Sequence, residues 1–581
     1  MAARGTVRRV RRDAAILALA AASALVIARL VATVPPARAA ESLAGGAAAQ
    51  SHDAATWWSH IQVLSADSMR GRMTGTEDYV HAARYVADRF RTYGAVPAGD
   101  SPPRTDAEAY FQNVPFVYHK IREPECSVSL WRGDKRVPFE LGTDGYLSAA
   151  VESADTIDAG LVFVGHGLSV PELGYSDLRG VDLHGKIAVY FRSGPDTLPP
   201  NVRAHAQSTD MRWRGLRAAG AVGYIAIAPG GRRGGGWQRA LKQRLQPGLS
   251  LADPRLDPLG GAKFAMRISP AYFDSMLVGS GHTPEELIAL NERHLPLPAF
   301  PLPVRLSARV RTDRKLVNSP NIVAIIPGSD PVLRKQYVVV SAHLDHLGIG
   351  APVKGDSIFN GAMDNASGVA SVIEFARYAR AMKRPFRRSV VLLAVTGEEE
   401  QLFGSWWYAA RPTVPAGAIV ADINLDMFLP ILPLRTITVY GRTESDLGAR
   451  FAAVAARVGV AVEDDPDPRR NYFIRSDQYS FIRKGVPSLF FEIGAGVDTA
   501  ATSKLAAWNR DHYHDVTDDV SQPVDLEVAA AFTHLLYDFT RDVANAEQRP
   551  KWAKGSFFAR FAAVAPTPRA GTARHGAAKR R

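Results

Sequence analysis

The sequence predicts an α/β protein in which a mostly parallel sheet is sandwiched by helices. After residue 320, short β-branched, apolar runs alternate with stretches whose apolar residues recur at helical spacing. Strands are expected at 321–326, 337–341, 389–395, 419–425, 436–440 and 488–492. Helices are expected at 366–382, 446–458 and 526–544. Strands that alternate with helices in this way build a parallel sheet that is covered on both faces.

The length of 581 residues predicts more than one folded part, because it exceeds a single ordinary core. Between residues 126 and 300 the sequence changes to short strand-like runs punctuated by Gly and Pro, which predicts an inserted, mainly-β domain. Residues 57–90 are expected to be helical, with a break at Arg70-Gly71. The predicted organisation is a leader at 1–39, the first part of the α/β domain at 40–125, the inserted domain at 126–300, the main part of the α/β domain at 301–548 and a basic flexible tail at 549–581.

The formal net charge of +12 is concentrated at the two ends of the chain. Residues 1–38 carry +6 and residues 549–581 carry +9, which leaves about −3 for the body between them. Nucleic-acid binding usually needs a basic face on a folded domain. The charge distribution therefore argues against a nucleic-acid partner.

The N-terminus has the features of a bacterial-type secretory signal. Four arginines between residues 8 and 12 precede an apolar stretch at 14–34, and Ala37-Arg38-Ala39 supplies a site for cleavage after Ala39 or Ala40. We therefore expect a periplasmic or secreted protein without a stable membrane span after cleavage. The alternative is an uncleaved anchor, because the apolar run is nearly long enough to cross a bilayer. The single cysteine, Cys126, excludes an internal disulfide. No pattern in the sequence indicates an oligomeric state.

Five sets of acidic and histidine residues follow the predicted strands or lie near their ends. They are His343-Leu-Asp345, Asp364-Asn365, Glu398-Glu399, Asp426 with the nearby Asp422, and His512-Tyr-His514. Residues at the carboxyl ends of parallel strands gather in one crevice, even when they are far apart in the sequence. Each set alone is weak evidence of a site, but their order and placement together predict one.

Imidazole and carboxylate ligands in this number suit two divalent metal ions, with zinc favoured over manganese or cobalt. Asp364, in a turn before a helix, is placed to bridge the two ions, and Asp345 could orient the His343 imidazole. Of Glu398 and Glu399, one can bind metal while the other serves as general base. The residues alone do not decide between Asp422 and Asp426, or between His512 and His514.

These motifs resemble those of the co-catalytic di-zinc exopeptidases. The matching segments are His343-Leu-Asp345, Ala-Met-Asp364-Asn-Ala-Ser-Gly, Gly-Glu398-Glu399-x-x-Leu-Phe-Gly-Ser, Asn-Leu-Asp426-Met and Tyr-His514-x-x-x-Asp518. The family includes bacterial leucyl-type aminopeptidases, glutamate carboxypeptidase and the catalytically inactive transferrin receptor. The resemblance implies two zinc ions bridged by Asp364. It implies that His343 and Asp426 complete one site and Glu399 and His514 the other.

The resemblance also implies catalytic roles and a substrate class. Glu398 falls at the general-base position and Asp345 at the position of the aspartate behind the histidine ligand. The inserted segment, with Gly174-Tyr-Ser-Asp-Leu-x-Gly180, is similar to a protease-associated domain. The predicted function is that of an exported aminopeptidase that acts on peptides.

Other members of the same family suggest alternative functions. One is a carboxypeptidase or dipeptidase in which Arg475 or Arg483 binds a free carboxylate. The related glutaminyl cyclases use one zinc ion, whereas the ligand set here is complete for two. A receptor-like binding protein would be expected to have lost ligands, and every ligand position here is filled.

Overall fold

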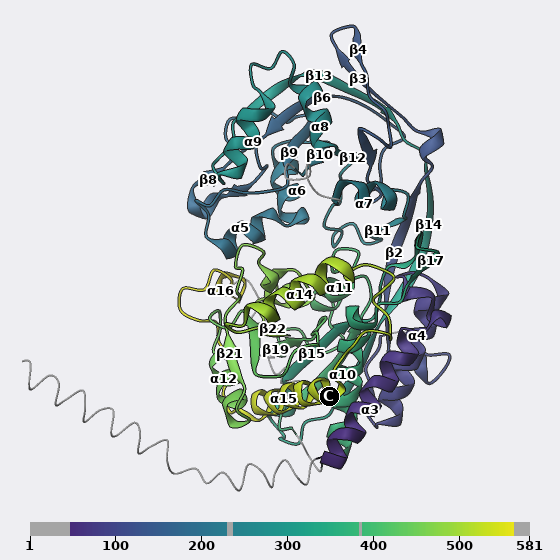
Figure 1. Cartoon of the computed structure of the whole chain (residues 1–581), viewed down its shortest axis with the longest axis vertical. Coiled ribbons are helices and arrows are strands. Elements are labelled where there is room, and N and C mark those ends of the chain that lie inside the picture. The colour runs from purple at the N-terminus through teal and green to yellow at the C-terminus, as the bar shows by residue number, and fades with distance from the viewer. Residues whose placement is uncertain (1–46, 101, 229–235, 383–385, 563–581) are drawn as a thin grey trace, which may run out of the picture. The chain divides into compact units, whose positions relative to one another are not determined.

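The structure, a computed structural model, describes residues 47–100, 102–228, 236–382 and 386–562 (Figure 1). The chain divides into two units, residues 1–56 and 57–581, and all features below belong to the second. The predicted secretory leader at 1–39 and residues 563–581 of the predicted tail lie outside the described residues. Within the described ranges, no helix combines the length and the apolar character needed to cross a membrane.

The larger sheet runs in the order β11-β2-β14-β18-β15-β19-β22-β20-β21, and β1 pairs with β14 at its side. The strands are β1 (Val96–Pro97), β2 (Phe111–Ile121), β11 (Gly248–Leu251), β14 (Thr312–Ile326), β15 (Tyr337–His343), β18 (Ser389–Val395), β19 (Ile419–Asn424), β20 (Thr436–Tyr440), β21 (Ala461–Glu463) and β22 (Ser488–Ile493). The central strands β18, β15, β19 and β22 are parallel to one another. The predicted parallel order therefore holds at the centre, whereas β14, β2 and β11 on one side and β20 on the other pair antiparallel.

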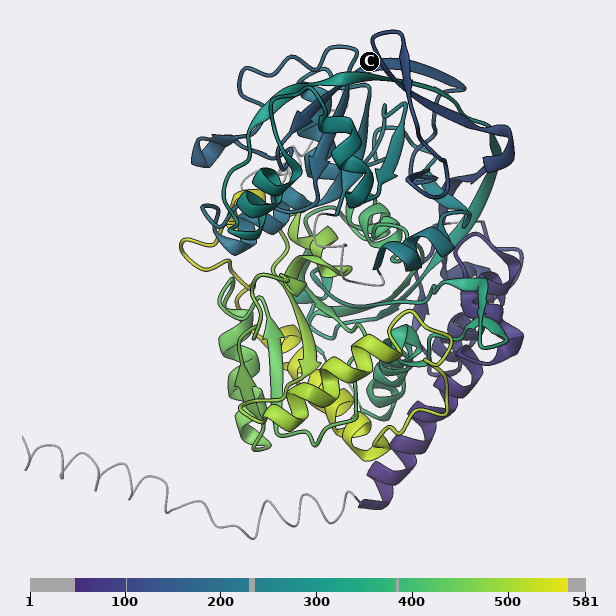
Figure 2. The same cartoon turned by 45° about the horizontal axis from the view of Figure 1, so that its top comes forward.

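Helices cover both faces of this sheet, as the sequence predicted. On one face, α4 (Glu77–Thr92), α10 (Ser367–Ala381), α12 (Leu447–Arg457) and α15 (Leu526–Asn545) pack on the sheet. On the other face lie α11 (Phe403–Ala410) and α13 (Gln478–Ile482). Alternation along β15 explains the division, because Val338 and Val340 face the first set while Val339 faces the second. Figure 2 shows the yellow and green helices beside the green strands.

The predicted strand at 321–326 is only the end of a longer strand. β14 begins at Thr312 and pairs with the whole length of β2, from Thr312 opposite Ile121 to Ile322 opposite Phe111. Its first half contains Asp313, Arg314 and Lys315 and has no apolar run, so no local pattern predicted a strand there. Hydrogen bonds to β2 hold this polar half in place.

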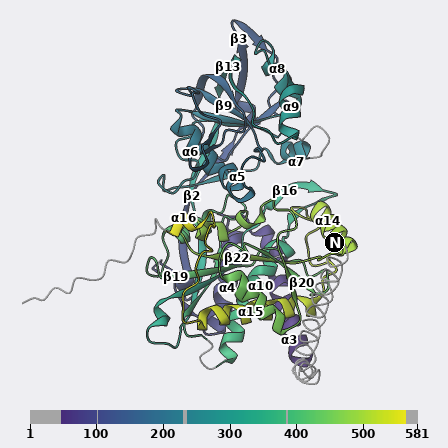
Figure 3. The ribbon, with the colours of Figure 1, turned by 90° about the vertical axis from the view of Figure 1, so that its left-hand side faces the viewer.

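A second sheet runs in the order β4-β3-β13-β6-β9-β10-β12-β5. Its strands are β3 (Ser127–Arg132), β4 (Lys135–Val137), β5 (Gly145–Leu147), β6 (Thr156–Val164), β9 (Ile187–Phe191), β10 (Gly223–Ile227), β12 (Ala265–Ile268) and β13 (Ala299–Arg309). Helices α8 (Pro270–Leu277) and α9 (Pro284–Glu292) pack on one face and α6 (Thr209–Ala218) on the other (Figure 3). Beside them, α5 (Pro200–Gln207) precedes α6 and α7 (Gly236–Gln243) precedes β11.

This second sheet occupies nearly the segment predicted as the inserted domain. The predicted boundary at 300 falls within β13, which pairs with β3 and β6 of the second sheet. Conversely, β11 leaves the inserted segment and pairs with β2 of the larger sheet. The similarity of the inserted domain to a protease-associated domain stays a prediction.

Part of the segment predicted as a flexible tail packs on the α/β domain. Phe558, just before α16 (Ala559–Ala562), is fully buried, with its ring centroid 5.4 Å from that of Phe473 and 6.4 Å from that of Trp552. The Trp552 indole donates a hydrogen bond to the Gly485 carbonyl at 2.9 Å. The folded α/β domain therefore extends beyond the boundary predicted at 548.

We expect Phe558→Ala to lower the free energy of unfolding by about 3–5 kcal/mol, because the substitution leaves a cavity among aromatic rings. Urea denaturation followed by tryptophan fluorescence measures the change. Val497→Ala is the matched control, since that side chain is fully exposed. An unchanged urea midpoint for Phe558→Ala would show that the segment after 548 contributes nothing to stability.

Candidate metal centre

The larger sheet brings the five predicted metal ligands together at the carboxyl ends of its central strands. His343 is the last residue of β15, Glu399 follows β18, and Asp426 follows β19. Asp364 lies in the turn at Ala362–Ala366 that leads into α10, and His514 follows α14 (Thr499–Asp511). Strand ends and adjoining loops thus place all five side chains in one region.

One set of three donors, here called the first donor group, consists of His343, Asp364 and Asp426. His343 Nε2 lies 3.1 Å from Asp426 Oδ1 and 3.2 Å from Asp364 Oδ1. Burial alone would lower the pKa of His343, but the facing carboxylates of Asp426 and Glu398 raise it well above its usual range. Such a concentration of negative charge around one imidazole suits a divalent cation.

A second donor group forms around the other oxygen of Asp364. His514 Nε2 lies 3.2 Å from Asp364 Oδ2 and 3.1 Å from Glu399 Oε2. Burial opposes ionisation of Asp364, yet hydrogen bonds from His343 and His514 hold its pKa well below the usual range. The two oxygens of this single carboxylate therefore face two separate sets of donors. That is the arrangement a bridging ligand requires.

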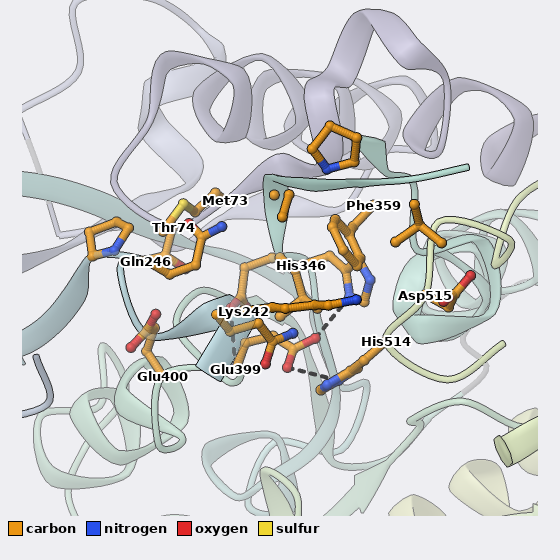
Figure 4. Close-up of a pocket in the computed structure, with 18 of the residues that line it drawn as sticks. Met73, Thr74, Lys242, Gln246, His346, Phe359, Glu399, Glu400, His514 and Asp515 are labelled. Carbon is orange, nitrogen blue, oxygen red and sulfur yellow. Dashed lines mark hydrogen bonds and ion pairs between the residues drawn. The ribbon is translucent and has the colours of Figure 1, made fainter. Parts of the chain in front are cut away.

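His346 is a further donor that the sequence analysis missed. Its Nδ1 lies 2.8 Å from Glu399 Oε1 and 3.9 Å from Asp364 Oδ2, and its side chain is fully buried. Figure 4 shows Glu399 between His346 and His514. His346 belongs to the second group together with Asp364 and Glu399. The signal that could have identified it is its position three residues after His343, in the same loop.

The Asp345 carboxylate holds the Glu398-Glu399 backbone and not the His343 ring. It accepts hydrogen bonds from the backbone N–H groups of Glu398 at 3.2 Å and of Glu399 at 3.3 Å. His343 Nδ1 lies 3.1 Å from the backbone carbonyl of Asp345, so the main chain orients the imidazole. Burial raises the pKa of Asp345 to about 6. Asp345 thus positions the loop that carries the two glutamates.

Glu398 stands beside the donor groups without a fixed partner. Its backbone is held by Asp345, but its carboxylate accepts no hydrogen bond within the described part of the chain. Burial raises the pKa of Glu398 well above its usual range, and the nearby charge on His343 opposes that rise. A partnerless carboxylate next to the ligands is free to exchange a proton.

The two alternatives that the sequence left open lie outside both groups. The Asp422 carboxylate is buried beneath the site and accepts a hydrogen bond from Ser341 Oγ at 2.8 Å. His512 Nδ1 lies 2.9 Å from Thr517 Oγ1, away from the other donors. Asp426 and His514 are therefore the members of each pair that join the donor groups.

Arg72 links the N-terminal segment to two of the ligand loops. Its fully buried guanidinium donates hydrogen bonds to four backbone carbonyls, those of Leu64, Leu344, Asn360 and Gly361. Leu344 follows His343 directly, and Gly361 stands three residues before Asp364. Burial lowers the pKa of Arg72 to about 10, while the nearby carboxylates oppose that change. The guanidinium remains charged and offsets part of their negative charge.

A cavity of about 620 Å³ opens against the second donor group (Figure 4). Glu399, His346 and His514 line it together with the apolar side chains of Met73 and Phe359. Helix α7 and the residues after it, from the inserted domain, contribute Gln238, Lys242 and Gln246. A further wall comes from the hairpin of β16 (Gly348–Val353) and β17 (Asp356–Phe359). We call this space the metal cavity.

Comparisons with known proteins give one family match and several similar structures. Residues 321–540 match the model described as Peptidase family M28. The aminopeptidase from Aneurinibacillus sp. strain AM-1 has 19% sequence identity and a TM-score of 0.50, with 85% of this chain and 95% of that chain covered. BSAP, a zinc aminopeptidase from Bacillus subtilis, has 17% identity and a TM-score of 0.44, with 87% and 97% covered. A Peptidase M28 precursor from Shewanella amazonensis SB2B has 16% identity and a TM-score of 0.41, with 86% and 98% covered.

The fold and the donor groups define a metal-dependent hydrolase. Residues 321–540, which carry all the donors of both groups, match peptidase family M28, and this match supports a zinc metallopeptidase. The predicted resemblance to the zinc exopeptidases is thereby confirmed.

We expect Arg72→Lys to lower the free energy of unfolding by about 2–4 kcal/mol and to reduce peptidase activity. A lysine ammonium is a compact point charge and cannot donate to all four carbonyls. Each buried carbonyl left without a donor costs about 1–3 kcal/mol. Thermal unfolding of the zinc-loaded protein measures the effect. Arg70→Lys is the control, because the Arg70 side chain is 56% exposed and pairs with Asp78 at the surface. Equal melting temperatures for the two variants would refute the structural role of Arg72.

Proposed function

We propose that the protein is an aminopeptidase that removes N-terminal residues from peptides with the help of two zinc ions. The observation that carries the proposal is the Asp364 carboxylate, whose two oxygens face two separate donor groups. A single metal ion would leave one of these groups without a function. The donor set of imidazoles and carboxylates fits zinc.

In this proposal each ion has its own ligands and shares Asp364. His343 and Asp426 hold one ion; Glu399 and His514 hold the other, with His346 beside them. When bound, two such ions polarise a scissile carbonyl and lower the pKa of a water molecule toward neutrality.

Glu398 is proposed as the general base. Its carboxylate takes the proton from the attacking water and then passes it to the nitrogen of the leaving amine. The absence of a hydrogen-bond partner for this carboxylate in the described chain supports the role. The hydrogen bond from the Glu398 backbone N–H to Asp345 also supports it, because it fixes the position of the backbone. A placed carboxylate in this role contributes about 10²–10⁴-fold to the rate.

The lining of the metal cavity supports recognition of a free amine. Glu400 lines it and has no cationic partner among the described residues. Burial and the nearby carboxylates of Asp345 and Glu399 raise the pKa of Glu400 to about 8, and a substrate ammonium group beside it would favour the ionised carboxylate. Asp515 adds a further acidic side chain to the lining. The similar structure from Aneurinibacillus sp. strain AM-1 is that of an aminopeptidase.

The carboxypeptidase alternative has one observation in its favour. Arg475 is exposed and has no acidic partner in the described chain, so it is available to a carboxylate. Arg483, the other arginine considered, is not available, since it pairs with Asp210 at 2.7 Å and stacks over Trp406. We further propose export of the enzyme, on the basis of the predicted leader alone.

Digestion of one peptide in three forms tests the function directly: free, N-acetylated and C-amidated. We expect acetylation to block cleavage and amidation to leave it, because the enzyme reads the free amine. A chelator should abolish cleavage of every form, and added zinc should restore it. Mass spectrometry identifies the residue released. Cleavage that amidation blocks, and acetylation does not, would make the enzyme a carboxypeptidase.

We expect Glu398→Gln to lower kcat by at least about 10²-fold while zinc content stays at the parent level, because the amide cannot accept the proton. Elemental analysis by mass spectrometry gives the zinc content per chain. Asp364→Ala is the contrasting variant, and it should lose both activity and most of the zinc. A kcat for Glu398→Gln within about tenfold of the parent would remove Glu398 from the base position.

A further inference from the structure

A second cavity, of about 640 Å³, adjoins the metal cavity and has a different charge. Glu400 lines both, so the two spaces meet at this side chain. Six arginines line the second cavity: Arg192, Arg212 and Arg267 from the inserted domain, and Arg469, Arg470 and Arg475 from the α/β domain. Glu400 is the one acidic residue among the described lining residues. We call this space the arginine cavity.

Three of the six arginines have polar partners within the protein. Arg212 is buried and donates hydrogen bonds to the carbonyls of His166 and Ser193. Arg469 and Arg470 both lie near Asp467, at 3.7 and 3.5 Å. These residues shape the wall and its positive potential but have fewer free donors.

The other three, Arg192, Arg267 and Arg475, have no hydrogen-bonded or acidic side-chain partner in the described part of the chain. The Arg475 guanidinium lies over the Tyr472 ring, 5.8 Å from its centroid. Arg192 directly follows β9 and Arg267 lies in β12 of the second sheet. Burial lowers the pKa of Arg192, and the like charge of Arg267 adds to this effect. Unpaired guanidinium groups facing one space repel each other, and a bound anion would relieve that repulsion.

Arg475 connects this cavity to the catalytic strands. The next residue, Ser476, accepts a hydrogen bond from the Asn424 side chain at the end of β19, at 2.8 Å. Gln478 accepts a second bond from the same amide, also at 2.8 Å. Asp426 follows Asn424 by two residues. The segment that carries Arg475 is therefore tied to the strand that leads to a predicted metal ligand.

We infer that the arginine cavity binds carboxylate groups of the peptide substrate on the C-terminal side of the scissile bond. The inference rests on the proposed aminopeptidase function, since an N-terminal residue held in the metal cavity leaves the rest of the peptide to pass Glu400. Guanidinium groups bind carboxylates through two parallel hydrogen bonds, which makes arginine the residue suited to this task. The preferred substrates are then short or acidic peptides. The carboxylate comes from the C-terminus or from Asp and Glu side chains.

The test compares three peptides with the same N-terminal residue: neutral and amidated, neutral with a free C-terminus, and acidic and amidated. For the parent enzyme, the peptide with a free C-terminus and the acidic peptide should each have a higher kcat/KM than the neutral amidated peptide. In the double variant Arg267→Gln/Arg475→Gln, the ratio of kcat/KM for a carboxylate peptide to that for the neutral amidated peptide should fall at least tenfold, through KM. A tenfold change corresponds to about 1.4 kcal/mol.

Arg136→Gln is the matched control, since Arg136 is an exposed residue on β4 that lines neither cavity. If the double variant lowers the kcat/KM ratio only for the peptide with a free C-terminus, the main-chain carboxylate is the ligand. If it lowers the ratio only for the acidic peptide, the side-chain carboxylates are the ligands. Both outcomes support the inference. Ratios that stay within twofold of the parent in the double variant would overturn it.

A binding measurement separates this inference from the proposed function. Acetyl-Asp-Glu has no free amine, so an aminopeptidase does not cleave it. Calorimetry should show that acetyl-Asp-Glu binds the zinc-loaded parent and the Arg136→Gln control. Its affinity for the double variant should be at least tenfold lower. That result supports the carboxylate site even if no peptide is cleaved from its N-terminus. The lack of such cleavage would refute only the proposed aminopeptidase function. Failure of the parent to bind acetyl-Asp-Glu would refute the arginine cavity as a carboxylate site.

Discussion

The burial of many carboxylates at one end of the larger sheet is the constraint on which the rest of the structure depends. Removing a carboxylate from water costs several kcal/mol unless opposite charge or hydrogen bonds offset the loss. Asp345, Asp364 and Asp518 are all nearly or fully buried within this region. The protein offsets them in part with the buried guanidinium of Arg72 and with backbone N–H groups. The remaining negative charge is what two divalent ions would neutralise.

The same hydrogen bonds explain how loops from distant parts of the chain hold one geometry. Asp518 accepts bonds from the backbone N–H groups of Met363 at 2.9 Å and Asp364 at 3.0 Å, so the segment after His514 fixes the turn of the bridging ligand. Asp345 fixes the two glutamates in a similar way, and Arg72 ties both ligand loops to the N-terminal segment. The N-terminal segment is therefore part of the catalytic domain, although the inserted domain separates it from the ligands in sequence.

Local patterns predicted the central fold and most of the donor groups, because buried parallel strands and their polar ends are continuous in sequence. The strand ending at His343 and the pair Glu398-Glu399 are examples. Features that depend on contacts between distant segments were not predicted. Arg72 follows a Gly in a turn, where an arginine is usually exposed, and its burial becomes visible only when four carbonyls surround it. His346 has the right residue type, but nothing in the sequence states that its side chain turns back toward Glu399. The arginine cavity combines residues from β9, β12 and the segment before α13, so no local charge pattern indicated it.

Chemistry and substrate selection are assigned to different parts of this molecule. The donor groups belong wholly to the α/β domain, whereas both cavities take part of their walls from the inserted domain. Contacts between the domains set those walls: Arg483 pairs with Asp210, and the Trp406 indole donates to the Leu256 carbonyl at 2.9 Å. Arg483 thus serves to hold the inserted domain and is not free to bind substrate. Because function is set by sites placed on a fold, substitutions in the inserted domain can change which peptides are accepted without touching a metal ligand. In the proposed function and the inference built on it, the acidic metal cavity takes the ammonium group of a peptide and the arginine cavity takes its carboxylates.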